Sequence, residues 1–355
     1  MGPVYVSRPA VVLPPHRIPR QLITDDITSR HRADLTPRRL AAMPKYLAQL
    51  PATRHFSRPL AAVLGEWGIE ERSEAVVADL VEIGLHAARA AIDAAGLRPV
   101  EIDCLITAHV TGFLLPGLDV ALHNALGLRP DAACRPTTEL GCAGGAYALV
   151  AAREYLAAHP GATVLVVAAE ILSLALYHHG DITVEQLIYK ALWGDGAAAA
   201  LVTDRPLGPG LRIDGTWEQL LPATTERYRA WLDQAGYHFG STKEALDSVP
   251  EVLPALRAHL AAAGGRLDFV VSHTGGPKIL DQLALGLEID PELLRHARAC
   301  LDEHGNLGGP SVLAVLERTH TTAPVHGDQG ILLGFGPGFR CIVLRGTWWS
   351  PPPES

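Results

Sequence analysis

The chain has 355 residues, of which 48% are hydrophobic, enough for one large core or two fused cores of ordinary size. Its net charge is −8, from 30 basic and 38 acidic residues, and this balance argues against a general nucleic-acid-binding protein. The five cysteines are odd in number and favour a reduced, cytoplasmic protein over a disulfide framework. The N-terminus lacks the order of a signal peptide and no unbroken apolar run reaches about 18 residues, so we expect no membrane segment.

Helical patterns alternate with short apolar runs along the first half of the chain. Residues 34–50 have helical spacing, with Asp34 or Thr36 as the cap and Pro37 in the first turn. Residues 73–97 predict a longer helix, because their apolar residues recur at three-and-four spacing. Strands are predicted at 102–110, 163–170 and 196–203.

The second half repeats this alternation after a segment rich in glycine and proline. That segment, residues 205–216, reads as a connector between two halves, 1–206 and 207–355. Apolar runs of this kind are typical of strands that are covered on both faces, so the predicted class is α/β. Both halves end in a glycine turn before an apolar strand, which weakly indicates a duplication. The second half predicts a helix at 249–264 and strands at 267–273 and 339–346.

Cys142 stands in a glycine turn directly before a helical segment, residues 143–159. At the N-terminus of a helix, the macrodipole and the free backbone N–H groups favour a thiolate, so we expect a lowered pKa for this thiol. The glycines allow a sharp turn and a close approach of a substrate or of a neighbouring helix. The alternative is that Cys142 is a small buried residue with no chemical role.

His273 and Asn306 stand in similar glycine turns more than a hundred residues downstream. His273 ends a predicted strand, where it could act as a base, as a charge partner for a thiolate or as an oxyanion donor. Asn306 precedes a helix, and its amide could donate to a developing oxyanion. Taken alone, the histidine could be a surface residue and the asparagine a plain turn residue. No motif predicts a bound metal or another cofactor.

Four segments together carry a resemblance to a known family. They occur in the order and spacing seen in type III polyketide synthases, the chalcone-synthase-like branch of the thiolase superfamily, over about residues 50 to 347. The resemblance implies the five-layered αβαβα thiolase fold made of two related halves, and a homodimer. It also implies that Cys142 is the nucleophile and that His273 and Asn306 are catalytic. The segments are GCAGGAYAL, SHTGGPKIL, HGNLGGPSVL and GFGPGF.

The resemblance also implies a reaction. Members of this family take an acyl group from coenzyme A (CoA) onto the cysteine, decarboxylate malonyl-CoA, and join the resulting enolate to the acyl group, often several times. A thiolate is a good nucleophile and a good leaving group, so it suits the loading and the release of the acyl group. Histidine and asparagine donors stabilise the enolate oxygen. CoA thioesters are therefore expected as substrates of an acyltransferase, and no cofactor is expected.

Five positions match residues that line or gate the cavity of the family. Trp193 stands where a gating phenylalanine is usual, and Phe239 matches a second gate in a segment that is longer than usual. Leu115 corresponds to the residue that reaches into the cavity of the partner subunit. Ala175 and Gly308 are smaller than usual, so they leave volume, whereas Trp193 removes some.

Three basic residues match positions that hold CoA phosphates or lie near them. Arg54 and Arg58 belong to a basic segment with this role in relatives, and Lys278 follows the turn after the catalytic histidine. Each of them could instead be a solvated surface charge. Thr274 stands where the family typically has proline, and we expect this difference to change the rigidity of the loop more than the chemistry.

Two other functions fit parts of this pattern. A ketoacyl-synthase-III-type enzyme shares the Cys, His and Asn but takes malonyl from an acyl carrier protein. In that group an asparagine follows the histidine closely, whereas this chain has HTGGPK, so the CoA-dependent reading is favoured. A catalytically inactive dimer that serves as an interaction subunit is the other alternative, and the intact set of three residues argues against it.

Overall fold

The computed structural model describes residues 2–178 and 180–352. The strands are β1 (Val4–Val6), β2 (Ala10–Val12), β3 (His16–Pro19), β4 (Thr53–Phe56), β5 (Cys104–His109), β6 (Ala133–Thr138), β7 (Val164–Glu170), β8 (Gly196–Thr203), β9 (Gly210–Thr224), β10 (Tyr228–Asp233), β11 (Gly236–Ser241), β12 (Phe269–Ser272), β13 (Gln329–Gly336) and β14 (Gly338–Trp349). The helices are α1 (Arg20–Arg30), α2 (Pro37–Leu47), α3 (Leu60–Val63), α4 (Ile69–Ala94), α5 (Leu118–Leu126), α6 (Gly144–Ala158), α7 (Leu172–Leu176), α8 (Val184–Leu192), α9 (Ser248–Ala262), α10 (Pro277–Leu287), α11 (Arg295–His304) and α12 (Ser311–Thr319), with a 3₁₀ turn, η2 (Gly141–Ala143), before α6.

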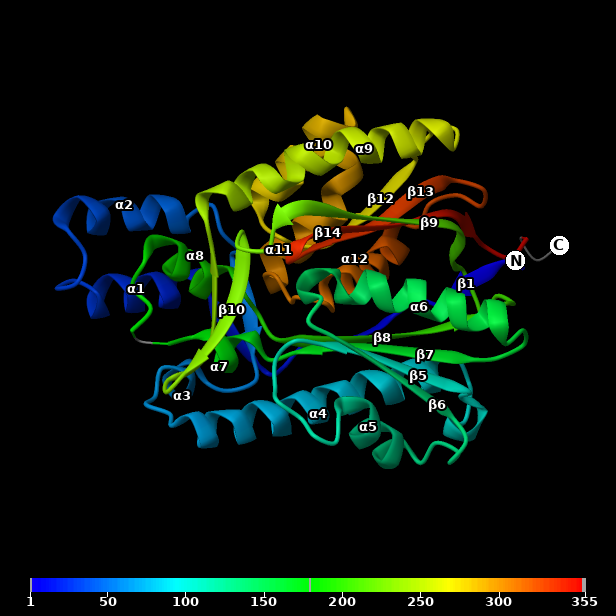
Figure 1. The fold of residues 1–355 in the computed structure, drawn as a ribbon, viewed down its shortest axis with the longest axis horizontal. Helices are drawn as coiled ribbons and strands as arrows, with labels where there is room; N and C mark the ends of the chain where they lie inside the picture. The colour runs from blue at the N-terminus through cyan, green and yellow to red at the C-terminus, as the bar shows by residue number, and fades with distance from the viewer. Residues whose placement is uncertain (1, 179, 353–355) are drawn as a thin grey trace.

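These elements stack in five layers, as predicted (Figure 1). One ten-stranded sheet has the order β12-β13-β14-β9-β1-β8-β7-β5-β6, with β2 paired to β8. It folds into two layers, and α6 and α12 lie between them, where α6 contacts β5, β7 and β13 while α12 contacts β8 and β12. Helices α4 and α5 cover the outer face of one layer, and α9 and α10 cover the outer face of the other (Figure 1). Helices α1 and α2 project to one side of the layers.

Strands β7 and β8 of the central sheet are buried at every position because both of their faces are covered. In β7, Val164 and Val166 belong to the core that includes α6, whereas Leu165 and Val167 belong to the core under α4. Successive side chains of a strand point to opposite faces, so one apolar run fills two cores. The continuous apolar runs in the sequence are therefore strands covered on both faces, as predicted.

The predicted helices are present, with shifted ends. Helix α2 begins at Pro37, and the hydroxyl of Thr36 accepts a hydrogen bond from the backbone N–H of Arg39 at 3.4 Å, so Thr36 is the cap. Helix α4 begins at Ile69, before the predicted start, and has two glutamates in its first turn, where negative charge is favourable.

The predicted connector at 205–216 is partly wrong, because β9 begins inside it at Gly210. A Cβ atom at Gly210 would lie 2.2 Å from the backbone oxygen of Val6, so this glycine allows a close approach of strands rather than a turn. Strand β1 pairs with both β8 and β9, so the sheet is continuous between the two predicted halves. The division of the chain at residue 206 stays a prediction.

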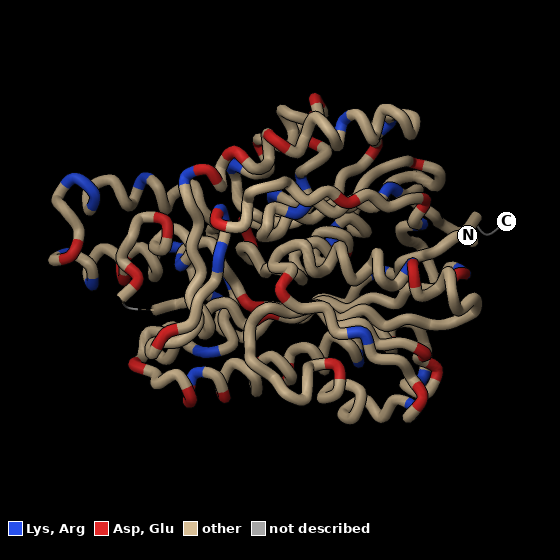
Figure 2. Tube along the Cα trace, in the orientation of Figure 1, with Lys and Arg blue, Asp and Glu red and all other residues tan. Residues whose placement is uncertain are grey.

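The hairpin formed by β10 and β11 was not predicted. It lies outside the large sheet, and β10 runs across the strand direction at one side of the layers (Figure 1). Acidic and basic positions are mixed over the molecule in this view (Figure 2), as expected for a modest net negative charge. No helix in the described part of the chain has the length and apolarity needed to cross a bilayer.

Candidate active site

A cavity of about 1160 Å³ brings Cys142, His273 and Asn306 together. Its walls come from the loop after β5, from α7 and α8, from the β10–β11 hairpin and from the turns after β12, α11 and β13. Ligand sites are typically about 300–1,000 Å³ in volume, so this cavity is large even for an enzyme that binds small molecules.

Cys142 lies in η2, in a turn that only glycines can form here. Gly141 has a φ of +55°, and a Cβ on it would lie 2.6 Å from Cδ of Pro337. At the first turn of α6, a Cβ on Gly145 would lie 2.3 Å from the backbone oxygen of Gly309. These glycines allow the turn that carries Cys142 to approach the turn that carries Asn306.

Both polar atoms of the Asn306 amide lie near the cysteine. Nδ2 is 3.5 Å and Oδ1 is 3.6 Å from Sγ of Cys142, and Oδ1 also accepts the backbone N–H of Gly308 at 2.8 Å. A flipped amide would place its NH₂ group against that N–H donor, so the hydrogen bond from Gly308 fixes which amide atom is the oxygen, and the nitrogen is left free to donate toward the thiol. The backbone of Asn306 also bridges to Trp193, through hydrogen bonds to Leu192 and Gly194.

His273 directly follows β12, and its backbone N–H donates to the carbonyl of Leu333. The imidazole packs edge-on against Phe335, with the ring centroids 5.5 Å apart. A Cβ on Gly275 would lie 2.5 Å from Nε2, so a glycine at this position leaves that nitrogen room to face the cavity. Nδ1 is buried and has no hydrogen-bond partner in the described structure. Burial lowers the pKa of His273 to about 4, so the ring is neutral at pH 7.

The lowered pKa that the helix start predicted for Cys142 is wrong. Burial raises the pKa of this thiol to about 11; the hydrogen bond from Asn306 opposes this rise, and the charge of Glu170 adds to it. The position before α6 is favourable for a thiolate, but removal of the thiol from water has the larger effect. The thiol therefore needs a proton acceptor in order to react at neutral pH, and neutral His273 lines the same cavity.

An aromatic cluster narrows the cavity at the positions proposed as gates. Trp193 follows α8 and Phe239 lies on β11, and their ring centroids are 5.4 Å apart. Tyr189 stacks on Trp193 at 4.7 Å and meets Phe239 edge-on at 5.3 Å. All three side chains line the cavity. The unpredicted hairpin thus supplies one side of this constriction.

Of the other three positions that were predicted to line the cavity, two do so and one does not. Leu115 is fully exposed at the cavity wall, and Gly308 lines the cavity with a φ of +67°. The prediction for Ala175 is wrong, because Ala175 is buried and is not among the residues that line the cavity. Helix α7 supplies Leu172 and Leu176 to the cavity wall instead.

The three predicted CoA-binding cations do not line the cavity. Arg54 is completely buried and donates to the carbonyl of Pro51, so it cannot meet a phosphate in solvent and that prediction is wrong. Arg58 forms an ion pair with Asp79 at 2.8 Å. Lys278 is exposed near the start of α10 and stays a candidate.

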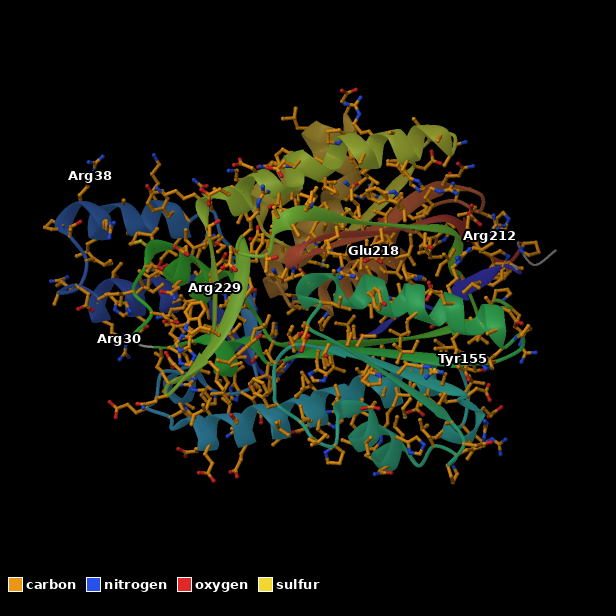
Figure 3. The ribbon with its side chains drawn as sticks, viewed as in Figure 1. Arg30, Arg38, Tyr155, Arg212, Glu218 and Arg229 are labelled. Carbon is orange, nitrogen blue, oxygen red and sulfur yellow. The ribbon has the colours of Figure 1, made fainter. Side chains whose placement is uncertain are left out.

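Several residues with ionisable side chains line the cavity although the sequence did not mark them, among them His109, Glu139 and Arg229. His109 ends β5, in the same kind of position as His273, so its strand-end location was an available signal. Glu139 has a φ of +66°, a conformation that non-glycine residues rarely adopt. Arg229 is exposed on β10 (Figure 3), and no Lys and no other Arg of the described residues lines the cavity.

Comparisons with known proteins identify the family of the chain. Residues 56–206 match the family "Chalcone and stilbene synthases, N-terminal domain", and residues 212–347 match the corresponding C-terminal domain. A 1,3,6,8-tetrahydroxynaphthalene synthase of Streptomyces griseus is 32% identical over 97% of this chain and 92% of its own length. A phloroglucinol synthase of Pseudomonas fluorescens is 30% identical over 96% of this chain and 98% of its own.

A solved structure extends this similarity to the fold. The crystal structure of the 1,3,6,8-tetrahydroxynaphthalene synthase of Streptomyces coelicolor, a bacterial type III polyketide synthase, superposes with a TM-score of 0.93 at 32% identity, covering 98% of this chain and 100% of the other. The chain belongs to the chalcone and stilbene synthase family of type III polyketide synthases.

Proposed function

We propose that this enzyme loads an acyl group from acyl-CoA onto Cys142 and extends it with units from malonyl-CoA by decarboxylative Claisen condensation. The observation that carries the proposal is the amide nitrogen of Asn306, 3.5 Å from Sγ of Cys142, in a large cavity that His273 also lines. A nucleophile with two nearby donors, enclosed by apolar walls, suits acyl transfer.

In the loading step, Sγ of Cys142 attacks the carbonyl carbon of the acyl-CoA. Nε2 of His273 takes the thiol proton, because the ring is neutral and burial makes the free thiol a weak acid. A carbon–sulfur bond to Cys142 forms, the bond to CoA breaks, and the CoA sulfur leaves with the proton. The acyl group then lies on Cys142, and His273 is neutral again.

In the extension step, malonyl-CoA loses CO₂ and its electron pair forms the enolate of acetyl-CoA. The N–H of Asn306 stabilises the enolate oxygen, where negative charge develops, and neutral His273 adds a second donor in the tautomer that carries its proton on Nε2. The apolar walls favour this step, because a carboxylate is poorly solvated there and CO₂ is neutral. The enolate carbon then attacks the Cys142 thioester, and the cysteine leaves as a thiolate.

The size of the cavity supports repeated extension followed by cyclisation, because the growing chain must stay enclosed. We also propose a homodimer. Phe113 and Leu115 are 66% and 100% exposed in the isolated chain, although their loop lines the cavity, so a second copy of the chain would cover an apolar loop beside the site.

The test of the proposal is turnover of malonyl-CoA with a panel of acyl-CoA starters in the absence of carrier protein, with products identified by mass spectrometry. Condensation products are expected. Turnover that requires malonyl bound to an acyl carrier protein would instead assign the enzyme to the ketoacyl-synthase-III type.

Alkylation of Cys142 should depend on His273. In a His273→Gln variant, iodoacetamide alkylation at Cys142 should rise about tenfold per pH unit from pH 7 to 10, because burial raises the pKa of the thiol to about 11 and only the thiolate reacts. The wild-type enzyme should react at least about tenfold faster at pH 7, because neutral His273 accepts the proton. Peptide mass spectrometry measures both rates.

Cys134 provides the internal control for this experiment. It is partly exposed on β6 and does not line the cavity, so its alkylation rate should be the same in both proteins, and acyl-CoA should protect Cys142 but not Cys134. Identical pH profiles for Cys142 in the two proteins would rule out His273 as the proton acceptor.

Arg229 should contact a phosphate of CoA. An Arg229→Gln variant should raise KM for malonyl-CoA about 2- to 5-fold, the effect of one exposed ion pair, with little change in kcat. The malonyl thioester of N-acetylcysteamine lacks phosphates, so its KM should not change.

Arg58→Gln is the matched control, because Arg58 is paired with Asp79 away from the cavity. An equal rise in KM for both thioesters would show that Arg229 shapes the cavity and does not bind phosphate. If KM for malonyl-CoA rose only in the Arg58 variant, the phosphate contact would belong to Arg58, as the sequence predicted.

A further inference from the structure

Two buried hydroxyl groups lie on the Oδ1 side of Asn306, within hydrogen-bond distance of each other. Oγ of Ser311 is 3.2 Å from Oδ1 of Asn306, and Oγ1 of Thr274 is 2.9 Å from Oγ of Ser311. Both side chains are at most 1% exposed. Thr274 directly follows His273, and Ser311 begins α12, five residues after Asn306. The two hydroxyl groups therefore connect the turn that carries His273 with the turn that carries Asn306.

The donors and acceptors of Ser311 determine where its proton goes. A hydroxyl has one proton and two lone pairs. Oγ of Ser311 accepts the backbone N–H of Leu307 at 2.9 Å, and it can accept the proton of Thr274 as well. When both lone pairs are used, the proton of Ser311 is directed to Oδ1 of Asn306.

Thr274 has a second acceptor, the carbonyl of Gly305 at 3.0 Å. If its proton goes there, Ser311 can turn its own proton toward Thr274, and Oδ1 of Asn306 keeps only the N–H of Gly308. The position of the Thr274 proton therefore sets whether Ser311 donates to Asn306, and a proton directed to Ser311 also strengthens that donation.

We propose that Ser311 and Thr274 are positioning residues for the decarboxylation step, a role that rests on the proposed function. The chain from Thr274 through Ser311 to Oδ1 holds the amide with Nδ2 toward Cys142. When negative charge develops on the enolate oxygen, the amide donates more strongly and its Oδ1 becomes a better acceptor. Hydrogen bonds in a chain strengthen one another in this way, so the donation from Ser311 stabilises the charged state most.

This role differs from the one expected from the sequence, which was a change in loop rigidity. A proline at position 274, as is typical of the family, would have neither a hydroxyl nor a proton to give.

The experiment compares CO₂ release from malonyl-CoA with alkylation of Cys142 in matched variants. Thr274→Val keeps the shape and removes the hydroxyl; Ser311 can then donate to Oδ1 only without the strengthening from Thr274, so CO₂ release should slow about 2- to 3-fold, less than the loss of a whole hydrogen bond would cause. Thr274→Ser restores the hydroxyl and should restore most of the rate. Ser311→Ala should lose at least as much as Thr274→Val. Alkylation should change less than CO₂ release in all three, because it needs no oxyanion stabilisation.

The double variant tests whether Thr274 acts on Asn306 through Ser311. Thr274→Val should have no further effect in a Ser311→Ala background, because Thr274 acts through Ser311. Additive losses, or equal losses in alkylation and in CO₂ release, would overturn the proposal. If Ser311→Ala does not fold, since it also leaves the N–H of Leu307 without its acceptor, the comparison of Thr274→Val with Thr274→Ser decides. Wild-type CO₂ release reports separately on the proposed function.

Discussion

A Cys142→Ala variant is expected to fold normally and to lose acyl loading completely. No other cysteine lines the cavity in the described structure, so no second thiol can replace it. Condensation should fall by on the order of 10⁴-fold or more, as it does when the nucleophile of a covalent enzyme is removed. Intact-protein mass spectrometry after incubation with acyl-CoA measures the loading, and product mass measures the condensation.

The same variant should still release CO₂ from malonyl-CoA within about tenfold of the wild-type rate, since decarboxylation uses donors and needs no covalent bond to Cys142. Its melting temperature should change little, because the substitution removes one sulfur that faces the cavity and adds no strain. An acyl adduct on the Cys142→Ala protein would place the nucleophile elsewhere. Loss of CO₂ release together with loading would show that the thiol also shapes the decarboxylation site.

Local sequence patterns predicted the parts of this structure that depend on local physics. The alternation of side chains along a strand explains why β7 fills two cores, and the glycine turns at Cys142 and Asn306 mark places where backbones approach closely. A histidine at the end of a strand also lines the cavity at β5, where His109 stands, so the pattern that marked His273 at β12 predicts His109 as well.

The errors concern properties that burial determines. The sequence shows that Cys142 precedes a helix, but it does not show the desolvation that raises the pKa of the thiol. Arg54 belongs to a basic segment, yet it is completely enclosed. In β11, Tyr237 and Phe239 face the cavity while Gly236 and His238 are buried, so the apolar positions do not mark a core and the hairpin went unpredicted. The position of α7, which brings Leu172 and Leu176 but not Ala175 to the cavity wall, is likewise set by tertiary packing.

Replacement of Asn306 by Asp should have the opposite effect from Cys142→Ala. The aspartate keeps the shape of the side chain, and the N–H of Gly308 and the hydroxyl of Ser311 can still donate to it. The change replaces the N–H that faces Cys142 with an oxygen, so the enolate loses a donor and meets a negative charge. CO₂ release should fall about 10²- to 10³-fold or more, the effect of removing one oxyanion donor. Radiolabelled malonyl-CoA measures this rate.

Acyl loading of the Asn306→Asp protein should still reach completion, although more slowly, because the new carboxylate opposes the thiolate 3.5 Å away. Asn306→Ala is the matched control, since it removes the donor without adding a charge; its loading should be faster than that of the Asp variant, and its CO₂ release should still be low. If the Asp variant released CO₂ at the wild-type rate, the amide could not be the oxyanion donor. Loss of loading in Cys142→Ala and loss of decarboxylation in Asn306→Asp would separate the two proposed steps. Loading would then depend on Sγ and decarboxylation on Nδ2, two atoms that the close glycine turns hold side by side.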